Sequence, residues 1–305
     1  MPSRVSSTKL KTKQESRVTT RSKKLFLVFI PAAVIVIAAL LGAYFLFNPT
    51  LPVLPKAAII DQVSSSQLSD PPSRHVNETL INITKSLLYS RFSHVDYYSD
   101  NATVELYRLL PSKGYKLIVW SAHSALNNQS KFVAISSSEK YGSKNYDQYT
   151  SEELTLCNIT GDQQLYFAIT PTFVRDRMEG RFDDTIIILT TCNGLKEGYY
   201  STADALLEKG AKAVISWNGW VSLSDDDAAV PKLLRYLIID NNTIGEAVRK
   251  IPVTHDTEFG SSTLRFEPYN TDDYRIPDYG KGSNMTTSKL MAAPIHRKVR
   301  PALYV

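Results

Sequence analysis

Residues 185–189 read Thr-Ile-Ile-Ile-Leu, and Cys192 follows three positions after this run ends. A short apolar run without polar alternation is typical of a strand that is buried on both faces of a sheet. Comparable runs occur at 57–60, 116–120 and 211–217, and segments with helical spacing of apolar residues lie between them. This alternation predicts an α/β fold, with a doubly wound, mostly parallel sheet that helices cover on both faces.

Several helices are marked by residues that favour helix ends. Pro171 follows the capping residue Thr170, and proline is preferred at the first helical position. Ser224 is expected to begin a longer helix. Thr243 and Glu246 have the spacing of a capping box, which predicts a further short helix near the end of the domain.

The segment 126–163 is rich in Ser, Tyr and Asn. We interpret it as an excursion from the sheet, either a lid or a small hairpin, with strand structure resuming at 165–169. The folded domain is predicted to cover 57–268, a length that is sufficient for one full hydrophobic core. For the remaining residues, 269–305, the composition predicts a loosely ordered tail, because it combines acidic residues, several glycines and a basic end.

The N-terminal region predicts a membrane anchor. Residues 25–47 read LFLVFIPAAVIVIAALLGAYFLF and contain no charged residue. At about 1.5 Å per residue this run crosses a hydrocarbon core about 30 Å thick. A cleaved secretory signal would have a shorter apolar core, and a buried helix of a soluble domain would show a polar face. We therefore expect a single transmembrane helix at 25–47, joined to the domain by the proline-containing linker 48–56.

The distribution of charge predicts the orientation of this anchor. The arm 1–24 carries eight Lys and Arg against Glu15 alone, whereas the whole chain has a formal net charge of +5. Basic residues beside a membrane segment stay on the cytoplasmic side, so the arm is predicted to be cytoplasmic and the domain extracytoplasmic. Because the excess positive charge lies in the arm and not in the domain, the sequence does not predict a nucleic-acid-binding domain. The expected partners are the lipid bilayer and a peptide or protein substrate.

Acceptor sites for N-glycosylation agree with an extracytoplasmic domain. An Asn-X-Ser/Thr sequon is a surface feature of secreted chains. Seven of them occur, all beyond the predicted membrane helix, and they begin at Asn77, Asn82, Asn101, Asn128, Asn158, Asn241 and Asn284.

Two reactive side chains follow predicted strands closely. His123 lies three residues after the run ending at Trp120, and Cys192 has the same offset from its own strand. Ligands of parallel sheets bind at the carboxyl ends of the strands, so both side chains are expected at one cleft. An imidazole that accepts a thiol proton there activates the sulfur as a nucleophile. Backbone N–H groups near Ser124 and at Cys192 are candidate donors to an oxyanion.

Three motifs around these residues carry a family resemblance. They are LIVWSAHSA at 117–125, TIIILTTCNG at 185–194 and GAKAVISWNGWVS at 210–222. In these features the chain resembles the caspase-like (clan CD) cysteine peptidases, and most closely the CHAT- and separase-type domains. The resemblance implies a caspase-like fold and an endopeptidase without a cofactor, with His123 as the catalytic histidine and Cys192 as the nucleophile. Ser124 and Thr191 stand where that family has Gly and Ala.

The residues after the third motif have two interpretations. Asp225, Asp226 and Asp227 favour a helix N-terminus through capping and the helix dipole. The resemblance also implies a possible acidic substrate pocket for Arg or Lys side chains, with Trp217 and Trp220 as walls, although core packing explains these tryptophans equally well. No residue cluster has the spacing of metal ligands, and no glycine-rich phosphate loop occurs, so neither a metal nor a cofactor is predicted.

The two cysteines of the chain, Cys157 and Cys192, leave a second function open. Outside the cell, two cysteines are often joined in one disulfide. A Cys157–Cys192 bond would consume the candidate nucleophile. The alternative to a peptidase is therefore a catalytically inactive caspase-like module that binds or senses at the cell surface.

Overall fold

The computed structural model describes residues 55–65, 78–144, 146–159 and 164–279, together with Ile35, Ile37 and Ala38. The chain separates into two units, 1–53 and 54–305, and the folded domain belongs to the second. The three described residues of the first unit are helical and exposed. Within the described residues, no helix has the length and apolar character needed to cross a bilayer. The rest of 25–47, the arm 1–24 and most of the linker 48–56 lie outside the described residues, so the anchor stays a prediction.

A six-stranded sheet forms the centre of the domain, in the order β12-β9-β8-β3-β1-β2. Every neighbouring pair is parallel except β12 and β9, which are antiparallel. The prediction of a mostly parallel sheet is therefore confirmed. The six strands are β1 (Lys56–Asp61), β2 (His94–Tyr98), β3 (Tyr115–Ser121), β8 (Thr185–Thr190), β9 (Ala211–Trp217) and β12 (Leu264–Glu267).

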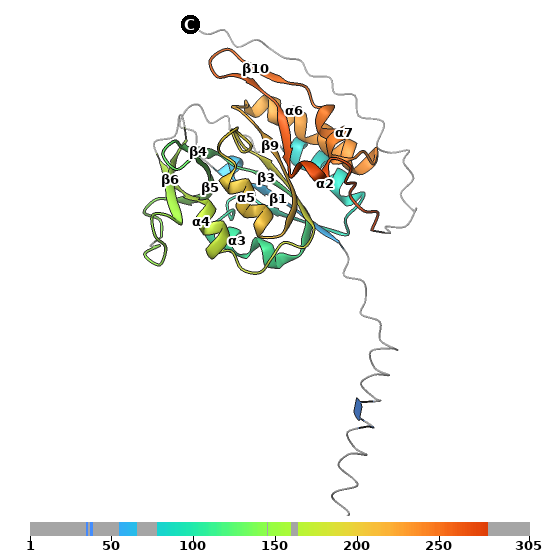
Figure 1. The fold of residues 1–305 in the computed structure, drawn as a ribbon, viewed down its shortest axis with the longest axis horizontal. Helices are drawn as coiled ribbons and strands as arrows, with labels where there is room; N and C mark the ends of the chain where they lie inside the picture. The colour runs from blue at the N-terminus through green and yellow to red at the C-terminus, as the bar shows by residue number, and fades with distance from the viewer. Residues whose placement is uncertain are drawn as a thin grey trace, which may run out of the picture. The chain divides into compact units, whose positions relative to one another are not determined.

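Helices cover both faces of this sheet. Successive residues of a strand point to opposite faces, and here both sets of side chains are apolar and are buried under helices. In β8, Ile187 and Leu189 belong to one hydrophobic cluster, whereas Ile186 and Ile188 belong to another. Figure 1 shows α3, α4 and α5 on one side of the sheet and α2, α6 and α7 on the other. These helices are α2 (Glu78–Tyr89), α3 (Val104–Leu109), α4 (Pro171–Asp176), α5 (Ser201–Glu208), α6 (Leu223–Leu234) and α7 (Ile244–Arg249).

The polar segment 126–163 contributes strands to a second, antiparallel sheet. The prediction of a lid or a small hairpin was therefore wrong. The order of this sheet is β4-β5-β7-β6, so the strand predicted at 165–169 belongs here and not to the central sheet. The polar composition was misleading, because Ser136 and Ser137 are fully buried, and the Ser137 hydroxyl donates to the Phe167 carbonyl at 2.9 Å. The strands are β4 (Ser124–Asn127), β5 (Phe132–Lys140), β6 (Leu154–Asn158) and β7 (Leu165–Ile169).

The capping residues mostly act as predicted. Thr170 caps α4, and Thr243 and Glu246 complete both halves of a capping box at α7. The expected role of Ser224 was wrong: Ser222 caps α6, and its hydroxyl accepts a hydrogen bond from the Asp225 N–H at 3.1 Å. A π-helical turn, Arg235–Ile239, then continues from α6.

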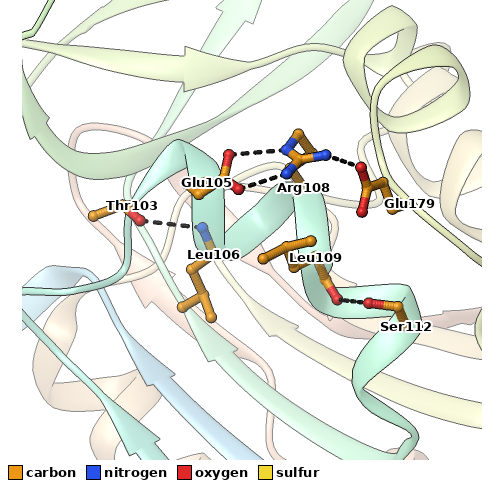
Figure 2. Close-up of polar contacts among 7 residues, drawn as sticks. All are labelled: Thr103, Glu105, Leu106, Arg108, Leu109, Ser112 and Glu179. Atoms are coloured by element: carbon orange, nitrogen blue, oxygen red, sulfur yellow. Dashed lines mark hydrogen bonds and ion pairs between the residues drawn. The ribbon is translucent and has the colours of Figure 1, made fainter.

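Helix α3 is fixed at both ends by polar contacts (Figure 2). The Thr103 hydroxyl accepts from the Leu106 N–H at 3.1 Å and caps the first turn. Arg108 bonds Glu105 within the helix and reaches Glu179, which follows α4. The Glu179 N–H donates in return to the Arg108 carbonyl at 2.7 Å, so the segment after α4 is tied to α3.

The chain remains packed beyond the predicted domain boundary at Pro268. Ile276 is buried in the second cluster, with Tyr274 and Tyr279 packed against it, and Arg91 donates to the Ile276 carbonyl at 3.1 Å. Residues 269–279 therefore belong to the folded domain, whereas 280–305 lie outside the described residues. The remaining elements are the hairpin β10 (Thr254–Asp256) and β11 (Gly260–Ser262), and the short turns η1 (Val63–Ser65), η2 (Leu110–Lys113) and η4 (Tyr269–Thr271).

Candidate active site

The loops that carry His123 and Cys192 leave neighbouring strands at the same edge of the central sheet. Strands β3 and β8 pair in parallel, and their last paired residues are Ser121 and Thr190. The Ala122 N–H extends this ladder toward the Thr190 carbonyl at 3.4 Å. His123 and Cys192 thus occupy equivalent positions, two residues beyond the paired ends. The backbone positions at one sheet edge agree with the strand-end argument, and the meeting of the two side chains at one cleft stays a prediction.

Gln62 fixes the histidine loop from the other side. The side-chain oxygen of Gln62 accepts a hydrogen bond from the His123 backbone N–H at 2.8 Å. The backbone N–H of Gln62 donates to the Ser121 carbonyl at 2.9 Å. Gln62 is fully buried, so this arrangement is shielded from water. The sequence analysis missed this residue. The available signal was its position directly after β1, at the same sheet edge as the two candidate catalytic residues.

Ser124 connects the two loops directly. Its hydroxyl donates to the Cys192 carbonyl at 2.7 Å. The Ser136 N–H donates to the His123 carbonyl at 2.9 Å, which makes Ser124 and Ile135 a non-hydrogen-bonded pair of the β4–β5 ladder. The Ser124 N–H consequently points away from β5, and β4 is the edge strand of its sheet. This orientation suits the role of oxyanion donor that the sequence suggests for Ser124.

The turn after Cys192 is held close to the end of β9. Asn193 has a left-handed backbone with φ of 61°, and its N–H donates to the Gly219 carbonyl at 2.8 Å. Gly194 lies so near Ser216 that an added Cβ would be 2.1 Å from the Ser216 hydroxyl oxygen. Only glycine fits at this close approach. The turn therefore presents Cys192 in one defined position.

The Cys192 thiol is partly buried and contacts the backbone of Val221. The Val221 N–H lies 3.5 Å from the sulfur, which is also 3.5 Å from the Val221 carbonyl oxygen. Burial raises the pKa of the Cys192 thiol, and the nearby charge of Asp226 raises it further, while the Val221 N–H acts in the opposite direction. In this arrangement the protonated thiol is the favoured form.

Asp226 and Trp217 lie in the core and not in an open substrate pocket. Trp217 is 0% exposed and Asp226 is 7% exposed. The indole N–H of Trp217 donates to an Asp226 oxygen at 2.7 Å. Asp225 accepts from the Ser222 hydroxyl at 2.7 Å, as part of the cap of α6. Core packing and helix capping are therefore the roles that the structure gives these three residues, which corrects the suggestion that Trp217 and Asp226 line an acidic pocket.

We expect the Asp226 carboxyl to reduce stability at neutral pH. Burial raises the pKa of Asp226 from 3.8 to about 6, although the hydrogen bond from Trp217 partly offsets this effect. Between these values the folded state binds more protons than the unfolded state, so stability falls as the pH rises from about 4 to 6. Asp226→Asn keeps the shape without the charge. Relative to the wild type, the variant should gain up to about 3 kcal/mol between pH 4 and pH 8, given the rise in pKa from 3.8 to about 6.

Urea unfolding of both proteins across this pH range measures the difference. Asp225→Asn is the matched control, because this neighbouring carboxylate lies in the cap and no such gain is expected from it. A constant difference between wild type and Asp226→Asn at all pH values would contradict the prediction.

The two cysteines are both free thiols and lie in different clusters. Cys157 is fully buried with Ala134, Tyr166 and Ala168 in the core of the second sheet, whereas Cys192 packs against the second cluster of the central sheet. Burial raises the pKa of Cys157 to about 11, which makes this thiol unreactive at neutral pH. The Cys157–Cys192 disulfide, which would favour the binding-module alternative, is not formed in the structure.

The described sequons are accessible. Their five asparagines, Asn82, Asn101, Asn128, Asn158 and Asn241, are all exposed, and Asn77 and Asn284 lie outside the described residues. Within the described part of the chain, no group of three His, Cys, Asp or Glu side chains is placed to hold a metal ion. A hollow on the second sheet, lined among others by Tyr141, Tyr146 and Phe167, includes neither His123 nor Cys192.

The three sequence motifs lie on β3, β8 and β9, which are consecutive neighbours in the central sheet. They therefore meet at one edge of the sheet, although the chain separates the first two by some sixty residues. No protein-family model matches the chain, and no curated protein matches it significantly in sequence.

Proposed function

We propose that the protein is a membrane-anchored, extracytoplasmic cysteine endopeptidase of caspase-like type. The observation that supports this most is the hydrogen bond of 2.7 Å between the Ser124 hydroxyl and the Cys192 carbonyl, which joins the loop of a histidine to the loop of a cysteine. The order of the six strands, with the three motifs on adjacent strands, supports the caspase-like interpretation of the fold.

In the proposed reaction, His123 accepts the proton of the Cys192 thiol, and the sulfur attacks the carbonyl carbon of a peptide bond. The Ser124 N–H donates to the resulting oxyanion. When the intermediate collapses, the C–N bond breaks, and His123 gives its proton to the leaving amine. Water, deprotonated by His123, then attacks the thioester and releases the acid with the free thiol.

The resting state of the thiol gives a specific reason to consider a second function. The raised pKa of Cys192 keeps the sulfur protonated, and Ser124 occupies the place of the family's glycine. A catalytically inactive caspase-like module that binds at the cell surface would have the same features.

The test uses the full-length chain in detergent or nanodiscs and a mixture of unstructured peptides. The wild type should cleave peptides, and an acyloxymethyl ketone peptide should add its mass to Cys192. Cys192→Ser should lose both properties. Cys157→Ser is the matched control, since it removes the other thiol, which is buried away from this site, and should retain both. A folded wild-type chain that cleaves no peptide and takes up no label would favour the binding module.

We expect the described sequons to carry glycans when the chain is made in a eukaryotic secretory host. Exposed acceptor asparagines in an extracytoplasmic domain meet the requirements for the modification. Treatment with an N-glycosidase should lower the apparent mass, and changing Asn82, Asn101, Asn128, Asn158 or Asn241 to Gln should each remove one glycan. Asn218→Gln is the control, because Asn218 begins no sequon. A chain that enters membranes without any glycan would contradict the proposed orientation.

A further inference from the structure

An aromatic pair includes Trp220, a residue of the loop that contacts the turn of the candidate nucleophile. The rings of Trp220 and Phe259 are stacked, with centroids 4.7 Å apart and planes inclined by 26°. Both sequence neighbours of Trp220 contact the cysteine turn: the Gly219 carbonyl accepts from the Asn193 N–H at 2.8 Å, and the Val221 N–H contacts the Cys192 sulfur at 3.5 Å. The residues on both sides of Trp220 thus hold its backbone next to that turn.

The hairpin that carries Phe259 is fastened to the same loop. Asn218 and Thr263 exchange two hydrogen bonds, of 3.0 and 2.8 Å, and the Gly219 N–H donates to the Ser262 hydroxyl at 3.0 Å. A Cβ at Gly219 would lie 3.2 Å from the Cβ of Ser262, so the two backbones are in close contact. The base of the hairpin is thus joined to the loop that contacts Cys192.

The tip of the hairpin is preorganised and presents Phe259 to solvent. The Asp256 carboxylate accepts from the Glu258 and Phe259 N–H groups at 2.8 and 2.9 Å. Phe259 remains 54% exposed although it stacks on Trp220. In Figure 1 the hairpin (β10, orange) projects from the body of the domain. Leu223, at the start of α6 and one residue after the Val221–Ser222 pair, is also exposed.

We propose that Trp220 and Phe259 form an aromatic shelf that binds a large apolar side chain of the substrate next to the scissile bond. The inference rests on the proposed peptidase function and adds the substrate class: peptides with Leu, Met, Phe or Tyr at that position. Flat aromatic faces bind such side chains by dispersion and by removal of apolar surface from water. The buried state of Asp226 and the capping role of Asp225 argue against recognition of Arg or Lys at the same place.

The first arm of the test measures kcat/KM for three peptides that differ only in a Phe, Leu or Arg residue before the cleaved bond. The Phe and Leu peptides should exceed the Arg peptide by about tenfold or more, in line with the discrimination that apolar contacts provide. Phe259→Ala should lower kcat/KM of the Phe and Leu peptides and so remove most of this preference. Tyr269→Ala is the matched control: Tyr269 is 78% exposed and stacks on Phe266, but it follows the far end of β12, whose Glu267 pairs with Val214.

The second arm does not depend on peptidase activity. The rates at which iodoacetamide and its N-benzyl derivative alkylate Cys192 are measured by mass spectrometry on the full-length chain. The shelf should make the benzyl reagent several times faster than iodoacetamide in the wild type and in Tyr269→Ala, but not in Phe259→Ala.

The two arms separate the two proposals. Peptide cleavage without a preference for apolar residues, or with a preference that Phe259→Ala leaves intact, overturns the shelf and spares the peptidase. A benzyl preference that Phe259→Ala abolishes, in a chain that cleaves no peptide, keeps the aromatic site and overturns the peptidase. Equal alkylation rates for the two reagents in the wild type overturn the shelf.

Discussion

Changing His123 to Ala should lower kcat for peptide cleavage by a factor of about 10²–10⁴, the usual contribution of a positioned general acid and base. The residue occupies the position beside Cys192 at the shared edge of β3 and β8. Burial and the charge of Asp226 raise the pKa of Cys192, so the sulfur depends on a neighbouring base for activation. KM should change little, because in the proposed reaction the imidazole acts on the proton and not on substrate binding.

His94→Ala is the matched control for this measurement. His94 is exposed on β2 and bonds Asp96 at 2.8 Å, on a strand that has no contact with β8 in the sheet order. The control should keep the wild-type kcat. A His123→Ala enzyme that retains its rate would show that the thiol is activated by another group, and the proposed pairing of base and nucleophile would be abandoned.

Changing Trp217 to Ala should destabilise the domain more than any other single substitution considered for it. Trp217 is fully buried in the core that α6 covers, and truncation of a buried Trp costs about 3–5 kcal/mol. The same change removes the indole donor of Asp226, which leaves a buried carboxylate oxygen without that hydrogen bond, at a further cost of about 1–3 kcal/mol. Urea unfolding at pH 7 measures the combined loss.

Two further variants separate these contributions. Trp217→Phe keeps most of the volume and removes the N–H, so it should show mainly the hydrogen-bond loss. Adding Asp226→Asn to Trp217→Phe should recover part of that loss, because the unsatisfied charge is gone. Trp220→Ala, at a half-buried position, should lower the free energy of unfolding far less than Trp217→Ala. Equal losses for Trp217→Ala and Trp220→Ala would disagree with the burial seen in the structure.

The central sheet was predictable because its strands carry their own signal. The run 185–189 and its three counterparts are apolar on both faces, and each became a strand between two cores. The second sheet was not predictable in the same way. Its buried serines, Ser136 and Ser137, read as polar surface in the sequence, and only their tertiary surroundings allow them to be buried.

The residues of the candidate site likewise differ in how well the sequence predicts them. His123 and Cys192 follow apolar strands, so a local rule finds them. Gln62 reaches the histidine loop through a hydrogen bond, and Phe259 reaches Trp220 through stacking; both contacts join distant segments and depend on the assembled fold. The triple aspartate shows the opposite error, since adjacent residues of one type have different surroundings. The Asp225 carboxylate bonds the capping residue Ser222, whereas Asp226 is buried against Trp217.

The passage from β3 to β4 has a mechanical consequence. β3 ends at Ser121 in the central sheet and β4 begins at Ser124 in the second, so only Ala122 and His123 span the junction. Cys192 lies in the turn that follows β8 of the central sheet. A tilt of one sheet against the other would therefore strain this two-residue junction, and the hydrogen bond of 2.7 Å from the Ser124 hydroxyl of β4 to the Cys192 carbonyl is a contact that resists such a tilt.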